Sequence, residues 1–394
     1  MNTLLLSTEV QNFIDNNINT DINRLLFKGS PFEGITVQEL ANQIISKKKS
    51  EKKLPSWFET VAIFYPPKLS IEQTSSEITA NYKSSLIQGN SMIDITGGFG
   101  IDCFYFSKKN EKVIHCEMNA DLSNIAKYNF EQLGVNNIET IPHDGLTYLK
   151  ESQENFDGIY IDPSRRSDAK GKVFLLKDCA PNVPDNLDFL FTKSNTILIK
   201  NSPILDISAT LKELQFVKEI HIVAVKNEVK ELLFLLEKDF NGDLEIKTIN
   251  IKKNGNENYT LKLNDKSEVK FGEPLTYLYE PNSAILKAGA FDQIGNSYGL
   301  IKLHQHSHLY TSNEKIINFP GRIFKIQNSF EYNKKKSKKE INSDKANITT
   351  RNFPKTVEQL RKELKLKDGG DRYIFFTTNI NNKLIVIDCK KIII

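Results

Sequence analysis

A glycine-rich turn at residues 92–102 constrains the fold of this chain more than any other stretch. It reads M-I-D-I-T-G-G-F-G-I-D, and three of its glycines fall within four residues that follow a short apolar run. The apolar run predicts a strand, and the spacing of apolar residues over 101–108 predicts an amphipathic helix. Glycines between the two permit backbone dihedrals that a Cβ forbids, and they let a ligand approach the main chain closely. We therefore expect a strand–turn–helix unit of an α/β fold with a ligand at the turn.

Four later apolar runs also end in polar side chains. The runs cover residues 112–116, 137–141, 156–161 and 196–199, and the polar residues that follow them are Glu117, Asp144, Asp162 and Lys200. Ligands of open parallel sheets bind at the carboxyl ends of the strands. The ordered series therefore predicts one binding site to which five strands contribute.

The glycine spacing separates two classes of nucleoside ligand. A dinucleotide fingerprint reads G-x-G-x-x-G, but Gly98 and Gly100 are followed by Cys103 where the third glycine is required. Asp94 and the glycines after it form a D-x-x-G-G-x-G pattern, which resembles motif I of class I methyltransferases. Glu117 follows Asp94 by 23 residues, a distance at which a carboxylate can accept the hydroxyls of a ribose.

Composition and motif spacing exclude several other classes of protein. The apolar run at residues 4–6 is too short for a signal peptide, and no run reaches the roughly 18 apolar residues of a membrane span. The four cysteines lack C-x-x-C spacing, so we expect neither disulfides nor a zinc site. His304, His306 and His308 alternate, and we expect a polar strand face there instead of a metal site. The sequence therefore predicts a soluble, cytoplasmic protein with no membrane or metal partner.

Basic residues are concentrated near the end of the chain. From Arg322 onward there are 18 Lys and Arg against 8 Asp and Glu, a net charge of +10, although the whole chain has a net charge of only +4. Clustered positive charge is expected of a nucleic-acid binder, because phosphate contacts supply most of the non-specific affinity. The run K-K-K-S-K-K at residues 334–339 is by itself typical of a solvated loop.

Helices and further strands are expected on both sides of the glycine turn. Residues 37–45 have helical spacing with Thr36 as N-cap, and residues 1–88 read as mostly helical. The remaining predictions are helices at 120–132 and 204–214, strands at 219–225, 244–251 and 259–263, and either an antiparallel strand or a helix at 229–236.

Five strings of residues together resemble one family. They are E-Q-T-S-S-E-I-T-A-N-Y-K, D-I-T-G-G-F-G-I-D, D-P-S-R-R, I-K-N-S-P-I-L-D-I and N-E-V-K-E-L-L. They are similar to strings of the bacterial class I S-adenosylmethionine-dependent methyltransferases with a THUMP-like domain, which are often grouped with RNA guanine-N2 methyltransferases. The string P-N-S-A-I-L-K-A-G-A-F resembles that family's ferredoxin-like module, and residues 351–371 resemble its THUMP-like end.

The resemblance implies an α/β fold and four regions. A Rossmann-like class I methyltransferase sheet would occupy residues 89–275, after an N-terminal helical region at 1–88. Two small α+β modules would follow, a ferredoxin-like module at 276–320 and a THUMP-like RNA-binding domain at 321–394. The implied cofactor is S-adenosyl-L-methionine.

The expected cofactor contacts come mainly from the strand ends and the glycine turn. Ser76 and Thr79 lie just before motif I and either hold the methionine end of the cofactor or only cap a helix. The complete expected set is Ser76, Thr79, Asp94, Thr96, Gly97, Gly98, Gly100, Glu117, Met118, Asp144, Gly145 and Asp162.

The string D-P-S-R-R after the fourth strand holds the expected catalytic residues. Amino methyltransferases place an (N/D)-P-P-(Y/F/W) turn here; Asp162 and Pro163 match it, whereas a serine and Arg165 replace the second proline and the aromatic residue. Asp162 is expected to orient the acceptor. Arg165 and Arg166 are expected to bind a substrate phosphate, and the alternative is an ion pair with a neighbouring aspartate.

A second group of residues points to a different acceptor. Lys83, Asp162, Lys200 and Glu228 occupy the topological positions of the K-D-K-E tetrad that ribose 2′-O-methyltransferases use. A hydroxyl needs a base such as a desolvated lysine to remove its proton, so such a cluster has a chemical purpose. Lysine is frequent in this chain, and chance placement is the alternative.

These predictions lead to one principal function and two alternatives. The chain is expected to methylate structured RNA, tRNA or rRNA, at a base amino group such as guanine N2 or at a ribose 2′-oxygen. Arg322, Arg351 and Lys355 are expected to bind the RNA together with Arg165 and Arg166. The alternatives are a non-catalytic RNA-binding factor that keeps the cofactor site, and a methyltransferase that acts on protein or small molecules.

Overall fold

The computed structural model describes residues 1–165, 175–263 and 267–393. The chain divides into two compact units. The first contains Met1–Glu219 and Glu231–Gly242, and the second contains Ile220–Lys230 and Asp243–Ile394. None of the described helices is long and apolar enough to cross a membrane.

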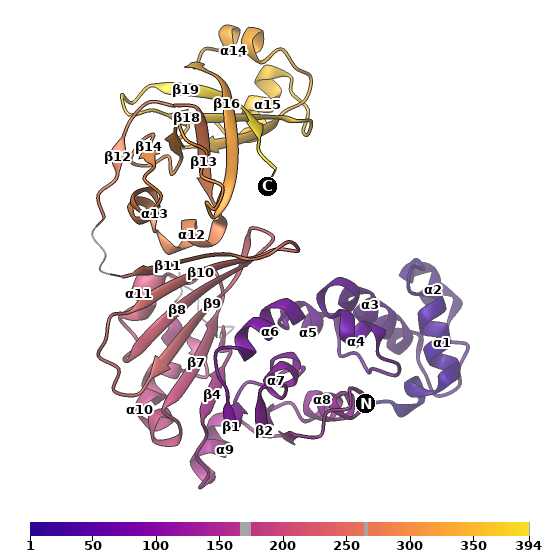
Figure 1. Ribbon diagram of the computed structural model, residues 1–394. Coiled ribbons are helices and arrows are strands. Elements are labelled where there is room, and N and C mark those ends of the chain that lie inside the picture. Colours follow the sequence, from indigo (N-terminus) through magenta and orange to yellow (C-terminus); the bar gives the residue numbers. More distant parts are fainter. Residues whose placement is uncertain (166–174, 264–266, 394) are drawn as a thin grey trace. The chain divides into compact units, whose positions relative to one another are not determined.

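Helices form the N-terminal part of the first unit (Figure 1). They are η1 (Thr3–Leu6), α1 (Thr8–Asn16), α2 (Ile22–Lys28), α3 (Val37–Lys53), α4 (Pro55–Glu59), α5 (Lys68–Gln73) and α6 (Glu77–Ser84). The expected N-cap of α3 is confirmed, because the Thr36 hydroxyl accepts the backbone N–H of Glu39 and the Glu39 side chain accepts the N–H of Thr36. Trp57 of α4 is fully buried against Phe99 and Phe104, so this region packs on the glycine turn and on the helix that follows it.

A mostly parallel sheet forms the centre of the first unit. Its strands are β1 (Gly89–Asp94), β2 (Asn110–Cys116), β3 (Ile138–Ile141), β4 (Gly158–Ile161), β7 (Thr196–Asn201) and β9 (Glu228–Glu237), in the order β9-β7-β4-β1-β2-β3. β1 pairs in parallel with β2 and β4, and Ile93 lies opposite Ile114 and Ile159. β9 is antiparallel to β7, so the segment that sequence left open as strand or helix is a strand.

Helices connect these strands. They are α7 (Ile101–Phe106), α8 (Ala120–Gln132), α9 (Gly145–Glu151), α10 (Val183–Lys193) and α11 (Ile207–Leu211). After β4 come a small antiparallel pair of strands, β5 (Ser164–Arg165) and β6 (Cys179–Ala180), and a 3-10 turn, η2 (Leu176–Asp178). The five predicted parallel strands and the helix at 120–132 are confirmed. The predicted helix at 204–214 is only five residues long. It begins after Asp206, whose side chain accepts the N–H of Ala209 as N-cap, and residues 202–205 form a turn. The α/β, Rossmann-like fold is thus present.

The second unit begins with three strands, of which the last two are antiparallel to each other. β8 (Val217–Val225) ends in a turn at Lys226 and Asn227, both of which have positive φ angles. β10 (Glu245–Ile251) and β11 (Glu257–Lys262) form a hairpin whose turn contains Gly255 at a φ of +113°. The predicted strands at 219–225, 244–251 and 259–263 are confirmed, and their order is β11-β10-β8.

An eight-stranded sheet completes the second unit, in the order β12-β14-β15-β13-β16-β19-β18-β17. The strands are β12 (Lys270–Phe271), β13 (Tyr277–Pro281), β14 (Ile301–Lys302), β15 (Tyr310–Ser312), β16 (Gly321–Glu331), β17 (Asn347–Arg351), β18 (Arg372–Thr378) and β19 (Leu384–Lys391). Its helices are α12 (Ser283–Ala288), α13 (Phe291–Ser297), α14 (Lys334–Ile341) and α15 (Val357–Leu364).

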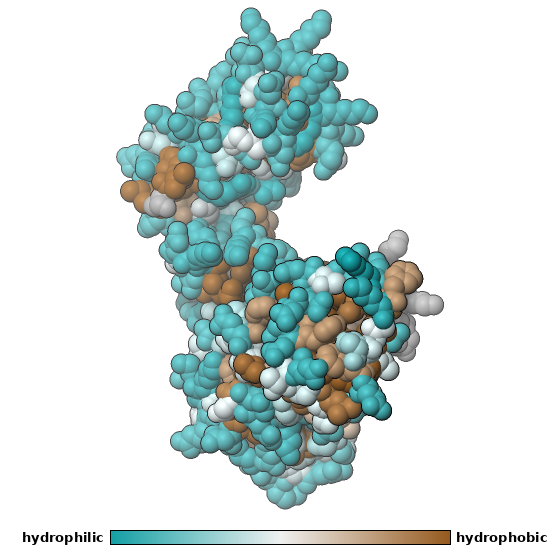
Figure 2. All heavy atoms as spheres, turned by 90° about the vertical axis from the view of Figure 1, so that its right-hand side faces the viewer, coloured by the Kyte–Doolittle hydropathy of each residue, from teal (hydrophilic) through white to brown (hydrophobic). Residues whose placement is uncertain are grey.

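Two apolar clusters hold the C-terminal part of this sheet. Ile341 of α14 and Leu360 of α15 pack with Phe376 of β18 on one face, where Figure 1 shows both helices. Phe324 and Phe375 lie in a separate cluster with Leu278. In Figure 2, hydrophilic residues cover most of the surface of the C-terminal part of the chain, and the lysines of α14 are exposed.

Two local predictions for the second unit are wrong. His304, His306 and His308 lie in the loop between β14 and β15 and not on a strand. His304 accepts the backbone N–H of His306 and contacts the side chains of Asn352 and Asn382. The lysine run at 334–339 forms helix α14 and not a loop, because Asn333 caps the helix and Ile341 anchors it in the core.

Candidate functional site

A cavity of about 650 Å³ lies in the first unit at the carboxyl ends of the parallel strands. It is lined by the turns after β1, β2, β3 and β4 and by the segment before α6. Eight of the residues expected to bind a cofactor line it, and they are Thr96, Gly97, Gly98, Glu117, Met118, Asp144, Gly145 and Asp162. The ordered strand ends therefore meet at one site.

The glycine turn forms one wall of the cavity. The Gly97 N–H donates to the Cys116 carbonyl oxygen at 2.8 Å, which ties the turn to β2. A Cβ at Gly97 would lie 2.4 Å from the ring of His115, so only glycine fits. Gly98 has a φ of +54°, and a Cβ there would meet no atom closer than 3.9 Å. The backbone at Gly98 is therefore open to a ligand.

Glu117 is fixed in the cavity by backbone hydrogen bonds. Its Oε2 accepts the N–H of Gly98 at 2.9 Å and its Oε1 accepts the N–H of Asn119 at 2.8 Å. A carboxylate has about four acceptor positions, so each oxygen can still accept a hydroxyl. Met118 beside it is 71% exposed and lines the cavity. This wall thus offers a fixed acceptor pair next to a free apolar side chain.

The end of β3 supplies the next wall. The Asp144 Oδ1 accepts the N–H of Thr147 at 2.9 Å and caps α9. A Cβ at Gly145 would lie 2.4 Å from Ile95, so the start of α9 packs directly on the turn after β1. Helix α9 therefore lies close against the turn after β1, and Asp144, its N-cap, is held at the cavity.

Asp94 supports the turn and does not line the cavity. It is buried and accepts the backbone N–H of Thr96 at 2.8 Å. The Thr96 hydroxyl in turn accepts the N–H of Asp162 at 2.7 Å. Burial raises the pKa of Asp94 to about 7. Gly100, another expected contact, also lies outside the lining, because it packs on Phe130.

Ser76 and Thr79 do not line the cavity either. The Ser76 hydroxyl accepts the N–H of Thr79 at 3.2 Å, so the two residues cap α6, which was the alternative prediction. Thr74 and Ser75, immediately before them, line the cavity instead. Within this polar string, Thr74 and Ser75 line the cavity, and Ser76 and Thr79 cap the helix.

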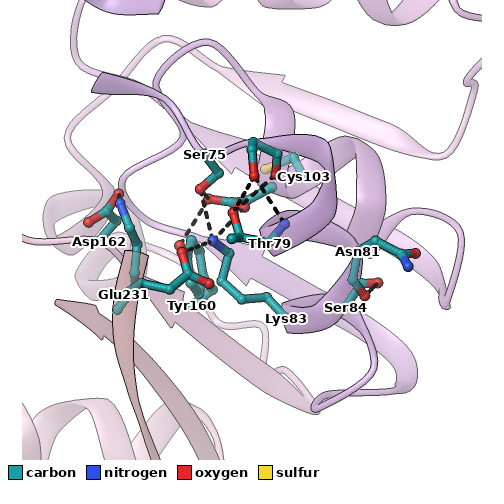
Figure 3. A network of polar contacts seen from close by, with 12 residues as sticks. Ser75, Thr79, Asn81, Lys83, Ser84, Cys103, Tyr160, Asp162 and Glu231 are labelled. Carbon is teal, nitrogen blue, oxygen red and sulfur yellow. Dashed lines mark hydrogen bonds and ion pairs between the residues drawn. The ribbon is translucent and has the colours of Figure 1, made fainter. Parts of the chain in front are cut away.

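A buried ion network adjoins this end of the cavity (Figure 3), and two of its members, Ser75 and Asp102, line the cavity. The ammonium of Lys83 is fully buried and contacts Glu231 Oε2 at 2.8 Å, Asp102 Oδ1 at 3.1 Å and the Ser75 hydroxyl at 2.8 Å. Asp102 Oδ2 accepts the hydroxyls of Ser75 at 2.8 Å and Tyr160 at 2.9 Å. The network therefore joins α6, α7, β4 and β9.

The charges of this network shift the pKa values of its carboxyl groups. Burial alone would raise the pKa of Asp102, but the positive charges of Lys83 and Lys200 outweigh it and lower the pKa. Burial raises the pKa of Glu231, which is 3% exposed. Asp102 is therefore the carboxylate that Lys83 stabilises as an anion, and sequence analysis did not identify its role.

Asp162 lines the cavity and forms an ion pair with Lys200. Burial alone would lower the pKa of Lys200, but Asp162, Glu231 and Asp102 outweigh it and raise the pKa well above its ordinary value. Lys200 is therefore a cation at neutral pH. Because the Asp162 side chain is 33% exposed, its carboxylate can still meet a group in the cavity.

The residues of the predicted tetrad are brought together only in part: Lys200 pairs with Asp162, and Lys83 pairs with Glu231. Glu228 is 74% exposed and pairs with Lys230 at 2.6 Å, whereas Glu231 faces Lys83. The two glutamates are three residues apart on β9, so they point to opposite faces of the sheet. The expectation for Glu228 is thus wrong, and the strand period identifies the correct residue.

The remaining residues of the D-P-S-R-R string are placed only in part. Pro163 is buried and does not line the cavity, whereas the serine after it does. The backbone of Arg165 belongs to β5, which pairs with β6. Arg166 lies outside the described residues.

The basic residues expected to bind RNA in the tail have partners within the protein. Arg322 and Arg351 both pair with Glu280, whose side chain is only 3% exposed. Lys355 pairs with Glu363 at 2.6 Å and donates to the Tyr332 hydroxyl at 2.9 Å. These three side chains are therefore already engaged within the second unit.

Comparison with known proteins identifies the family. Residues 277–320 match the model of a ferredoxin-like domain, and residues 321–391 match the model of a THUMP domain-like family. A crystal structure from Porphyromonas gingivalis W83, named "putative methyltransferase", is 30% identical with a TM-score of 0.89, and the alignment covers 99% of this chain and 98% of that one. The chain belongs to this methyltransferase family.

More distant proteins are similar over part of the chain. An uncharacterized RNA methyltransferase of Mycoplasma mobile is 28% identical over 97 residues, which are 24% of this chain and 27% of that protein. The chain thus spans about a quarter of the length of that relative. TrmK of M. capricolum in complex with S-adenosyl-homocysteine is 19% identical over 42% of this chain and 70% of that one, with a TM-score of 0.30.

Proposed function

We propose that this methyltransferase uses S-adenosyl-L-methionine to methylate an amino group of a base in RNA. The observation that carries the proposal is the cavity at the strand ends, where an open glycine backbone and two fixed carboxylates face one space. This donor and acceptor set fits a nucleoside. The cofactor, when bound, supplies a methyl group on a sulfonium centre.

Each wall of the cavity has one part of the cofactor to bind. Glu117 would accept the two ribose hydroxyls, and Asp144 would face the adenine, with Met118 packed on the ring. Thr74 and Ser75 would bind the methionine end. The negative charge of Asp102, which also lines the cavity, suits the ammonium group of that end.

The state of Lys200 favours an amine as the acceptor. A ribose hydroxyl requires a base to remove its proton, but the raised pKa of Lys200 keeps it protonated at neutral pH. Lys83 is fully buried and already has three partners. A neutral base amine instead needs a hydrogen-bond acceptor that orients its lone pair. The Asp162 side chain, which forms an ion pair with Lys200, offers this acceptor.

The relatives and the basic tail support RNA as the substrate. The Mycoplasma mobile relative is named an RNA methyltransferase, and the C-terminal module matches a THUMP domain-like family. The residues from Arg322 onward have a net charge of +10. Five lysines of α14 (Lys334, Lys335, Lys336, Lys338 and Lys339) are exposed on the surface. They replace the three paired residues as candidates for phosphate contacts.

Calorimetry with S-adenosylhomocysteine tests the cofactor site. Glu117→Gln should weaken binding by about tenfold to a hundredfold, because a hydrogen bond to a charged group contributes about 1.5–3 kcal/mol. Glu139→Gln is the matched control, since Glu139 is an exposed carboxylate on β3 outside the cavity. No binding by the wild-type protein, or equal binding by Glu117→Gln, would overturn the cofactor assignment.

Labelled S-adenosylmethionine and RNA from cells that lack the gene test the acceptor. The wild type should transfer the label to RNA, and nucleoside mass spectrometry should identify a methylated base amine. Asp162→Asn should lose transfer and retain S-adenosylhomocysteine binding. A 2′-O-methyl ribose product would refute the amine acceptor, and label found only in protein or small molecules would refute RNA.

A further inference from the structure

A second cavity, of about 930 Å³, lies within the second unit. It is formed by the turn after β8, the β10–β11 hairpin, the residues before β16 and the end of β19. Its residues do not belong to the cavity at the strand ends. Its volume is near the upper end of the roughly 300–1,000 Å³ of small-ligand sites.

A network of asparagines holds the frame of this cavity. Asn250 Oδ1 accepts the N–H of Asn227 at 2.7 Å, and its Nδ2 donates to Glu257 at 2.8 Å. Asn282 Nδ2 donates to the same glutamate oxygen at 3.1 Å. Asn227 Oδ1 accepts the N–H of Ser283 at 2.8 Å. The walls are thus fixed by hydrogen bonds and prepared for a ligand.

The charge of the lining is strongly positive. Five Lys and Arg face the cavity against Glu257 as the one acidic side chain in the lining. Lys252 and Arg322 have carboxylate partners. Lys226, Lys253 and Lys391 have none among the described residues. Three unpaired ammonium groups around one cavity fit a ligand with several negative charges.

Free amides and apolar side chains accompany these charges. Four asparagines (Asn254, Asn256, Asn258 and Asn318) are exposed in the lining, and their side chains form no hydrogen bond with the described part of the chain. An amide presents a donor and an acceptor together, which matches the edge of a base. Ile317 is 58% exposed and Ile393 is 91% exposed beside them.

We propose that this cavity binds a short unpaired segment of the RNA substrate. The segment's phosphates contact Lys226, Lys253 and Lys391, and its bases contact the free amides and the two isoleucines. The inference rests on the proposed function for the choice of RNA. It assigns substrate binding to a surface that neither the basic tail helix nor the cavity at the strand ends contains.

The chemistry of the lining distinguishes this ligand from two others. A duplex has its base edges paired, so its bases cannot use the free amides of the lining. An acidic peptide needs the lysines and not the four amides. Unpaired nucleotides use both, because their base edges are free and each phosphate carries a charge.

Binding of full-length protein to labelled RNA over a range of salt concentrations tests the proposal. The probes are an oligouridylate, a mixed-sequence single strand and the matched duplex, with polyglutamate as a competing polyanion. The test variant is Lys226→Ala/Lys253→Ala/Lys391→Ala. The control is Lys28→Ala/Lys109→Ala/Lys127→Ala, which removes three exposed lysines of the first unit.

The wild type should bind the single strands more tightly than the duplex. The test variant should lower the slope of log affinity against log salt by about 2, since each phosphate contact contributes about 0.7 for single strands. Asn254→Ala/Asn318→Ala should keep the slope and reduce the preference among base sequences. RNA binding by the control variant should equal that of the wild type, and S-adenosylhomocysteine binding should not change in any variant.

Three results would overturn the proposal. An unchanged salt slope in the test variant would place RNA elsewhere and leave the proposed function intact. Binding of polyglutamate that the test variant loses would assign the cavity to an acidic protein. A wild-type protein that binds S-adenosylhomocysteine but no RNA would refute both the cavity assignment and RNA as the substrate.

Discussion

Replacement of Lys83 by Met should strongly destabilise the first unit. Lys83 is fully buried, and its ammonium lies 2.8 Å from Glu231 and 3.1 Å from Asp102. Met keeps most of the side-chain volume but removes the charge, so two buried carboxyl groups lose their common partner. Breaking a buried ion pair in this way costs about 3–5 kcal/mol. We expect a loss of this size in the free energy of unfolding at pH 8.

Tryptophan fluorescence in urea measures this loss directly. Trp57 is the only tryptophan of the chain and is fully buried in the first unit, so its signal reports on that unit alone. Lys127→Met on α8 is the matched control, because Lys127 is exposed. The control should change stability by less than about 0.5 kcal/mol.

The pH dependence provides a second check of the same reasoning. Without Lys83, burial raises the pKa of both Asp102 and Glu231, so the folded variant takes up protons that the unfolded chain does not. Its deficit relative to the wild type should therefore shrink as the pH falls from 8 to 5. A loss below about 1 kcal/mol at pH 8, or a deficit that grows on acidification, would refute the account of the network.

Two further predictions concern stability. Burial raises the pKa of Asp94 from 3.8 to about 7, so the wild type loses stability as the pH rises between these two values. Asp94→Asn lacks this titration and should gain a few kcal/mol of unfolding free energy relative to the wild type over the same pH range, as measured by Trp57 fluorescence. A difference that stays constant with pH would contradict this. Arg322→Ala and Arg351→Ala should each lower the free energy of unfolding, measured by calorimetry, by about 1 kcal/mol or less, because the other arginine still pairs with Glu280. The double variant leaves Glu280 without a partner and should lower it by about 3–5 kcal/mol. A double-variant loss equal to the sum of the two single losses would contradict this.

Local sequence patterns predicted much of the fold and of the cavity. The strands that end at Asp94, Cys116 and Ile161 are short apolar runs with polar residues at their ends, and those polar residues meet in space. This works because parallel strands expose their carboxyl ends at one edge. Helix α3 was predicted from its apolar spacing and from Thr36 as N-cap, which are also local signals.

The sequence could not predict partners that are distant along the chain. Lys83 meets a glutamate 148 residues away, and the composition offers many acidic candidates for it. Counting the alternation of β9 distinguishes Glu231 from Glu228, but only once the segment is known to be a strand. Arg322 and Arg351 looked free for RNA because their common partner, Glu280, is far away in sequence.

The continuous hydrogen bonding of the eight-stranded sheet has a consequence for how this protein can be divided. The two family matches meet between residues 320 and 321, yet β13 pairs along its whole length with β16, from Tyr277 opposite Lys325 to Pro281 opposite Gly321. A chain cut at that boundary would leave β13 as a bare edge, with a row of backbone groups ready to join another molecule. The ferredoxin-like and THUMP-like segments thus share one sheet although two family models match them, and they should be expressed, purified or deleted together.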